Sequence, residues 1–142
     1  IIGEGDLLEA LKFQVYEFGL SSNIVFEGKL PHKKTLEMFN EFDLYIQYSF
    51  SEGFCNAVLE AQSRGVLSIV SDAGALPENV INNKTGWVIP KNNPTVLAKK
   101  IVEVISLSEI KKDKIKKQAI KRVKKQYNLE KQQKEFIDFY NF

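Results

Sequence analysis

The chain has 142 residues, of which 44% are apolar and 27% charged, the composition of one globular domain with a substantial core. Its net charge of +2 is too small to indicate a nucleic-acid partner by itself. A single cysteine, Cys55, excludes an intrachain disulfide and fits a reducing compartment, and no apolar run approaches the roughly 20 residues that span a bilayer. The opening IIGEGDLLEA has no initiator Met and no basic leader, so we expect a fragment of a longer protein.

The first part of the chain predicts short strands that alternate with helices. IIGEG is apolar and ends on glycine, as a buried strand does before a loop. DLLEALKFQVYEFGL carries apolar residues at helical spacing, with Asp6 as the expected N-cap and Gly19 as the stop. NIVFEG predicts a second strand that ends at Gly28, KKTLEMFNEF a short amphipathic helix, and DLYIQYS a central strand.

The pattern continues beyond a predicted helix at residues 55–64. VLSIVS predicts another buried strand, DAGALPENV a loop that runs into a helical turn, and TGWVIP a short strand. NPTVLAKKIVEVISL predicts a helix with Asn93 as its cap and Pro94 at its first position. Strands that alternate with helices indicate an α/β fold: a Rossmann-like parallel sheet with helices on both faces. Ligands of such sheets bind at the carboxyl ends of the strands.

The last part of the chain, residues 108–142, is rich in lysine but periodic. One apolar stripe is predicted on a first helix: Ile110, Ile115, Ala119, Val123 and Tyr127. A second helix is predicted to end the chain, with Leu129, Phe136, Phe139 and Tyr140. We therefore expect a Rossmann-like ligand-binding domain over residues 1–107, with the helices of residues 108–142 packing on that same domain.

The stretch SFSEGFCNAVLEAQSRG holds two glutamates, Glu52 and Glu60, eight residues apart. Glu52 precedes the predicted helix, whose start offers free backbone N–H groups to an anion such as a diphosphate; the expected free donors are the amides of Phe54, Cys55 and Asn56. Ionised carboxylates accept hydrogen bonds from sugar hydroxyls. A nucleotide sugar would satisfy both glutamates. The alternative is that Glu52 only favours the helix start and that Glu60 is an exposed helix residue.

The sequence resembles the GT-B fold, family 4 type retaining glycosyltransferases. EGFCNAVLEAQSRG is similar to their E-x7-E signature, with IIGEGDLLEAL and NIVFEGKLPHKKTLEMFNEFDLYIQYS before it and GVLSIVSDAGALPENVINNKTGWVIP after it. The resemblance covers residues 1 to about 107 well. It implies the donor-binding C-terminal half of an enzyme that transfers a sugar, of the hexosyltransferase type, from UDP or GDP to an acceptor hydroxyl in glycan or glycolipid biosynthesis.

The resemblance also implies a role for each matching residue. Glu52 would be the catalytic residue, holding hydroxyls of the donor sugar, and Glu60 would hold the ribose hydroxyls. Backbone amides facing the sugar and diphosphate would come from Gly53, Phe54, Cys55 and Asn56. The segment against the base would be Gly28, Lys29 and Leu30. Glu78 would fix its own loop more than touch the donor.

The sequence departs from the family pattern in three places. Cys55 stands where a second glycine is frequent, and AQSRG replaces the usual AMACG or AMAAG. The resemblance implies that the basic residues that bind the diphosphate in the family, and its acceptor-binding domain, would lie before residue 1. We therefore expect this chain to hold a donor only partly and to be inactive alone, without needing a metal or other cofactor; no cluster has metal-ligand spacing.

Two features have competing interpretations. His32, the only histidine, is expected in a loop, exposed or near the base, rather than as a catalytic base. The segment Lys111–Lys125 carries nine Lys or Arg against one Asp. This is usually a solvated helix face; the alternative is contact with anionic lipid at the cytoplasmic face of a membrane. A nucleic-acid partner is not expected, because interleaved aromatics are missing.

Two other functions remain open at this level. The first is another GT-B enzyme, such as a nucleotide-sugar epimerase, which would share the nucleotide site and need no acceptor. The second is a non-catalytic nucleotide-binding interaction module that kept the fold and lost the chemistry.

Overall fold

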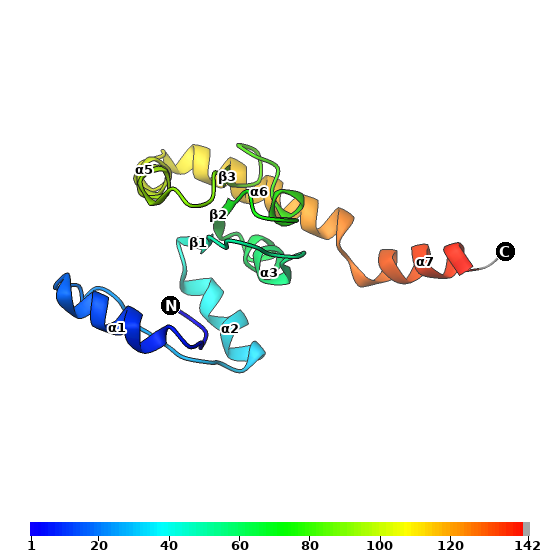
Figure 1. Cartoon of the computed structure of the whole chain (residues 1–142). Coiled ribbons are helices and arrows are strands. Elements are labelled where there is room, and N and C mark those ends of the chain that lie inside the picture. The colour runs from blue at the N-terminus through cyan, green and yellow to red at the C-terminus, as the bar shows by residue number, and fades with distance from the viewer. Residues whose placement is uncertain (141–142) are drawn as a thin grey trace. The chain divides into compact units, whose positions relative to one another are not determined.

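The computed structural model describes residues 1–140 and divides the chain into two compact units (Figure 1). The first unit is Ile1–Met38 and the second is Phe39–Phe142, whose residues 141–142 lie outside the described part. This boundary differs from the expected one at residue 107, and a single domain over residues 1–107 stays a prediction.

The first unit contains two helices, α1 (Leu8–Glu17) and α2 (His32–Met38). The two strands predicted here are wrong. Their segments meet in parallel at an isolated bridge between Ile2 and Gly28, where the Gly3 N–H donates to the Gly28 carbonyl and the Glu27 N–H donates to the Ile1 carbonyl, each at 2.8 Å. One bridge fixes too few backbone groups for a ladder, and no residue of this unit is buried. His32 begins α2 instead of lying in a loop.

The ends of α1 follow the sequence only in part. The prediction that Asp6 is the N-cap is wrong: Leu7 occupies that position, and no side chain caps the helix. Gly19 stops the helix as predicted, with φ +64, in the left-handed region where glycine carries no steric cost.

The second unit is built on a parallel sheet of three strands, β1 (Leu44–Gln47), β2 (Leu67–Ser71) and β3 (Trp87–Ile89), in the order β1-β2-β3. All three were predicted from apolar runs. All five residues of β2 are buried because it lies between the other two strands, with Ile46 opposite Ile69 and Val70 opposite Val88. The α/β fold class with a parallel sheet is therefore confirmed.

Helices connect and follow these strands. Their bounds are 3₁₀ helix η1 (Phe39–Glu41), α3 (Asn56–Ser63), α4 (Leu76–Asn79), α5 (Pro94–Ile105), α6 (Glu109–Gln126) and α7 (Leu129–Tyr140). The predicted cap of α5 is confirmed, since the Asn93 side chain accepts a hydrogen bond of 3.1 Å from the Val96 N–H.

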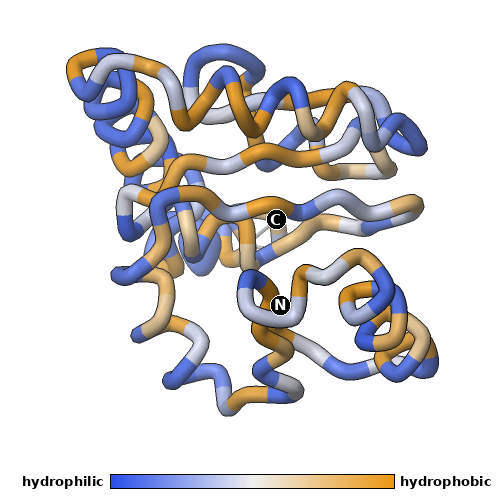
Figure 2. The backbone as a smooth tube through the Cα atoms, turned by 90° about the vertical axis from the view of Figure 1, so that its left-hand side faces the viewer, coloured by the Kyte–Doolittle hydropathy of each residue, from blue (hydrophilic) through white to orange (hydrophobic). Residues whose placement is uncertain are grey.

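Helices cover both faces of the sheet, as right-handed crossovers require. Alternate residues of β2 point to opposite sides. Val70 joins a core cluster with Val58 of α3 and Leu76 of α4, whereas Ile69 joins a second cluster with Trp87 and Val104 of α5. Figure 2 shows hydrophobic segments in the layer of strands and hydrophilic ones concentrated in the surrounding helices and turns.

Helix α6 packs against α3 and β2. Of its predicted apolar stripe, Ala119 and Val123 are buried, but Ile110 is 84% exposed, so the stripe begins later than predicted. Helix α7 leaves its apolar residues exposed. In residues 1–140, no helix combines the length and apolar character that crossing a bilayer requires.

Candidate functional site

The carboxyl ends of the three strands lie at one edge of the sheet, because the strands are parallel. Three loops leave this edge, at residues 48–55, 72–75 and 90–93. Hydrogen bonds join them: the Ser71 hydroxyl donates to the Ser49 carbonyl at 2.7 Å, and the Lys91 N–H donates to Asp72 Oδ1 at 2.8 Å. The loops therefore form one connected surface.

Tyr48 links the first loop to the third. Its hydroxyl donates to the Pro90 carbonyl at 2.7 Å and accepts from the Asn93 N–H at 2.8 Å. Lys91 adds a second link, because its Nζ lies 3.3 Å from the Phe50 carbonyl and 5.2 Å from the Phe50 ring centre. The segment before Glu52 is thus fixed by contacts with the loop that follows β3.

The Glu52 carboxylate is oriented by polar neighbours. Its Oε2 accepts hydrogen bonds from Gln47 Nε2 at 3.2 Å and from the Ser49 hydroxyl at 3.1 Å. Gln47 in turn accepts from the Tyr45 hydroxyl at 2.6 Å. Within residues 1–140, Glu52 Oε1 has no hydrogen-bond donor of its own. A half-buried carboxylate with one engaged and one available oxygen can accept a ligand hydroxyl.

The Glu52 backbone is fixed by the second loop. The Ala75 N–H donates to the Glu52 carbonyl at 3.2 Å. Gly74, with φ +51, approaches so closely that an added Cβ would lie 1.9 Å from that carbonyl oxygen. Only glycine fits here, both for its backbone conformation and for its lack of a side chain.

The electrostatics of this edge keep Tyr45 protonated. Burial raises the pKa of the Tyr45 phenol far above its ordinary value, and the nearby Cys55, Glu52 and Glu60 add to the shift. The phenol therefore remains a hydrogen-bond donor to Gln47 at any physiological pH. Both glutamates act on this one phenol, so both lie within electrostatic reach of Tyr45.

Helix α3 begins at Asn56, with Cys55 as its N-cap residue in extended conformation. The Cys55 N–H donates to Asn79 Oδ1 at 3.2 Å, and Asn79 Nδ2 donates to the Cys55 carbonyl at 3.2 Å. The prediction that the Cys55 amide is a free donor is therefore wrong: a buried asparagine occupies it. The amides of Gly53, Phe54 and Asn56 keep their predicted role as a hypothesis.

Burial raises the pKa of the Cys55 thiol, even though hydrogen bonds from the Val58 and Ala57 backbone act in the opposite direction. The thiol therefore stays protonated near neutral pH, which disfavours a role as a nucleophile.

Glu60 lies on the second turn of α3, half-buried, and is not the fully exposed residue of the ligand-free alternative. It stands four residues after Asn56, so both project from the same side of the helix. Helical side chains lean toward the N-terminus, which brings the Glu60 carboxylate toward the start of α3. A ligand bound at the start of α3 could therefore reach the Glu60 carboxylate.

The predicted base-binding segment belongs to the first unit. Gly28 has φ +65 and lies beside the Gly3 loop, to which its carbonyl is hydrogen-bonded. Lys29 forms an exposed ion pair of 3.3 Å with Glu4, and Leu30 is half-buried. The two glycine-containing loops therefore lie side by side, and a contact of residues 28–30 with a base stays a prediction.

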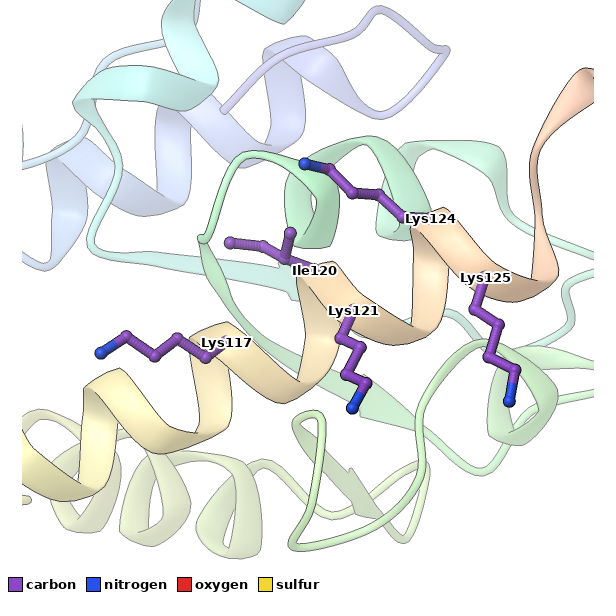
Figure 3. Close-up of a pocket in the computed structure, with 5 residues that line it drawn as sticks. All are labelled: Lys117, Ile120, Lys121, Lys124 and Lys125. Carbon is purple, nitrogen blue, oxygen red and sulfur yellow. The ribbon is translucent and has the colours of Figure 1, made fainter.

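The basic segment of α6 divides into inward and outward residues. Arg122 turns inward to α4, and Lys112 pairs with Glu109 at 2.8 Å. Figure 3 shows a hollow on α6 lined by Lys117, Ile120, Lys121, Lys124 and Lys125. Within residues 1–140, no group of three or more metal-ligating side chains gathers.

The sequence analysis did not identify several residues that orient Glu52 or fix the loop around it. They are Gln47, Ser49, Gly74, Asn79, Arg122 and Tyr127. Gly74 and Asn79 lie in DAGALPEN, where the sequence indicated a loop and a helical turn, and Arg122 is one of only two arginines. The positions of Asn79, Arg122 and Tyr127 were visible, but the backbone groups that they bond lie 24, 43 and 49 residues away in the chain.

Comparison with known proteins identifies the class. The family model "Glycosyl transferases group 1" matches residues 1–122, and the chain belongs to this family, whose fold is GT-B. A curated relative, the lipopolysaccharide core biosynthesis mannosyltransferase LpcC of Rhizobium leguminosarum bv. viciae, is 33% identical over 98 residues, which is 69% of this chain and 27% of that protein.

Solved structures agree with this fold. The C-terminal domain of the group 1 glycosyl transferase LpcC from Francisella tularensis has a TM-score of 0.78 at 25% identity, covering 87% of this chain and 64% of that one. Anabaena Alr3699/HepE in complex with UDP-glucose has a TM-score of 0.88 at 20% identity, covering 97% and 39%. The chain spans between 19% and 33% of the length of eight curated relatives that it matches.

Proposed function

We propose that this chain is the donor-binding domain, and the C-terminal half, of a retaining glycosyltransferase. The complete protein would transfer a sugar from a nucleoside diphosphate to an acceptor hydroxyl in glycan or glycolipid biosynthesis. The observation that carries the proposal is the Glu52 carboxylate, which is oriented by Gln47 and Ser49 at the carboxyl edge of the sheet next to the start of α3. Names of relatives support it: LpcC acts in lipopolysaccharide core biosynthesis, and HepE was solved with UDP-glucose.

The chemistry follows from the residues present. Glu52 Oε1 accepts a sugar hydroxyl and positions the anomeric carbon, while the backbone amides before and at the start of α3 face the diphosphate as charge builds on the leaving group. Glu60 accepts the ribose hydroxyls. Retention of configuration is the outcome expected from the E-x7-E signature, and upstream basic residues and the acceptor domain would complete the site.

The test of Glu52 is a kinetic one. In the complete protein, Glu52→Ala should lower turnover of the nucleotide sugar by more than tenfold, because an interaction that orients the reacting sugar is lost. The matched control is Glu103→Ala, which removes an exposed glutamate from the far end of α5. Turnover at the wild-type level in Glu52→Ala would refute the assignment.

Nucleotide binding tests Glu60 separately. Ligand-detected NMR of the 142-residue chain with UDP, GDP and ADP should show saturation of one ribose, which Glu60→Ala weakens. Nucleotide binding by the complete protein without turnover of any nucleotide sugar would favour the non-catalytic nucleotide-binding module. An epimerase would release free sugar or an epimer without any acceptor, so a product assay distinguishes the third possibility.

A second proposal concerns location: the outward lysines of α6 contact anionic lipid at the cytoplasmic face of a membrane. Lys117, Lys121, Lys124 and Lys125 recur at the spacing of one helix face, opposite the buried Ala119 and Val123. Each such lysine contributes about 1 kcal/mol at an anionic surface.

Vesicle sedimentation tests this surface. The complete protein should bind vesicles of phosphatidylcholine with phosphatidylserine and not those of phosphatidylcholine alone. Changing Lys117, Lys121 and Lys124 to Gln should weaken binding at least tenfold, about 1.4 kcal/mol or more. The control changes three exposed lysines elsewhere to Gln: Lys33, Lys84 and Lys99. If both triple variants lost vesicle binding equally, the net charge of the protein, and not the α6 surface, would explain the binding.

A further inference from the structure

The loop that carries Glu52 is hydrogen-bonded to the short helix α4. Asn79, the last residue of α4, is fully buried, and its amide side chain pairs with both the N–H and the carbonyl of Cys55, each at 3.2 Å. Two opposed hydrogen bonds to one residue fix the plane of the peptides on either side of it. The orientation of the peptides that lead into α3 therefore depends on where Asn79 stands.

Helix α4 spans only four residues, too few to hold its own position by internal hydrogen bonds. Its final carbonyls are taken by Arg122 of α6: Nη1 donates to the Asn79 carbonyl at 2.7 Å, and Nη2 donates to the Glu78 carbonyl. A cation at the carbonyl end of a helix is also favoured electrostatically. Arg122 thus sets the position of Asn79 from a distance of 43 residues in the chain.

Tyr127, which ends α6, makes the second contact with the loop. Its ring packs against the ring of Phe54 with centroids 5.5 Å apart. Its hydroxyl accepts from Arg122 Nη2 at 2.8 Å and lies 3.2 Å from the Glu78 carbonyl. The Arg122 guanidinium also stacks 5.0 Å from the Tyr127 ring centre. One end of α6 therefore touches the loop directly and also through α4.

A lysine could not replace Arg122 here. The guanidinium is planar and serves three acceptors in fixed directions, while its Nε is buried without a partner. An ammonium is a compact charge on a flexible stem and cannot reach both carbonyls and the phenol together. Arg122 is therefore not simply a surface charge that favours solubility, because its guanidinium fixes the position of α4.

We propose that Asn79, Arg122 and Tyr127 are positioning residues, which set the direction of the backbone amides of residues 53, 54 and 56 for a nucleoside diphosphate. This inference rests on the proposed function and adds to it: these residues do not touch the ligand, yet they determine its affinity. Helix α6, for which the sequence predicted an apolar stripe and a basic face, thus supports the ligand site through Arg122 and the Tyr127 that follows it.

The experiment measures binding of UDP, GDP and ADP to the complete protein by calorimetry at 25 °C, with the thermal midpoint recorded in parallel. Arg122→Lys and Asn79→Ala should each weaken binding of the preferred nucleotide about tenfold while the protein remains folded at 25 °C. Tyr127→Phe keeps the ring contact with Phe54 and should stay within threefold of wild type, whereas Tyr127→Ala should resemble Arg122→Lys. Arg64→Lys, at the only other arginine, is the matched control and should bind as wild type does.

A purely structural role gives a different pattern. The thermal midpoint would fall in Arg122→Lys and Asn79→Ala, but affinity at 25 °C would equal that of wild type, and this result would overturn the inference. If Asn79→Ala does not fold, the nucleotide affinities of Arg122→Lys and Tyr127→Ala decide between the positioning role and the purely structural role. If the wild type binds none of UDP, GDP and ADP, the proposed function fails and the inference fails with it. Wild-type binding with unchanged affinity in the folded variants rejects the positioning role alone.

Discussion

Residues 1–38 and residues 39–142 carry similar sequence patterns, apolar runs beside amphipathic helices, but only the second region builds a core. Both clusters of buried apolar side chains lie within residues 58–104, whereas no residue of the first region is buried and several of its large apolar side chains are exposed. The difference teaches that an apolar run becomes a strand only when neighbouring strands and helices cover it.

Removal of core volume gives the largest contrast between the two regions. Leu76, the first residue of α4, is fully buried, and Leu7, just before α1, is 70% exposed. Leu76→Ala should cost about 2–5 kcal/mol of unfolding free energy because a cavity forms. Leu7→Ala should stay within about 0.5 kcal/mol. Urea denaturation, followed by far-UV circular dichroism and by the fluorescence of the single Trp87, measures both; equal costs would break the comparison.

A matched pair of glycines gives the next effect. Gly74 and Gly28 both have positive φ, but an added Cβ would meet the Glu52 carbonyl at 1.9 Å in the first case and nothing within 4 Å in the second. Gly74→Ala should therefore cost about 2–4 kcal/mol, combining backbone strain with a clash. Gly28→Ala should cost about 1 kcal/mol from backbone strain alone. The unfolding midpoints of the two variants measure these costs, and equal shifts would contradict the expected difference between Gly74 and Gly28.

Helix capping gives a smaller contrast. Asn93 caps α5 through a hydrogen bond to the Val96 N–H, while α1 has no side-chain cap. Asn93→Ala should cost about 1 kcal/mol. Leu7→Asp should instead gain a few tenths of a kcal/mol by supplying the missing cap. Thermal unfolding of the two variants should move in opposite directions, and a shift of the same sign in both would count against the capping argument.

The smallest effect concerns the thiol of Cys55. Because burial raises its pKa, the folded chain binds the proton more tightly than the unfolded chain. Its contribution to stability is therefore present below the unfolded pKa and is lost as the pH rises through the folded pKa. At pH 8, Ellman's reagent should react with Cys55 more slowly in the folded chain than in urea.

A moved thiol provides the control for that measurement. In a Cys55→Ala background, Ser22→Cys places the thiol at an exposed position of the first region. It should react at nearly equal rates with and without urea. Fast reaction of Cys55 in the folded chain would show that its environment is not the one described.

Local pattern was enough to predict the three strands of the sheet and the helices α3 to α7. Each rests on features a few residues apart: an apolar run such as VLSIVS, a cap such as Asn93, a glycine such as Gly19 that ends a helix. Periodicity and turn chemistry are local properties, so one sequence reveals them. The spacing of Glu52 and Glu60, eight residues apart, was visible for the same reason, and their joint role in binding a ligand stays a prediction.

Tertiary structure alone decided the rest. The first two predicted strands failed because a run such as NIVFEG needs a neighbour to pair with along its length, and here it obtains one bridge. The Cys55 amide was counted as free because its partner, Asn79, is 24 residues away. Arg122 looked like one charge among nine, yet its guanidinium is committed to α4. Sequence determined which elements could form, and long-range packing determined which polar groups remain available to a ligand.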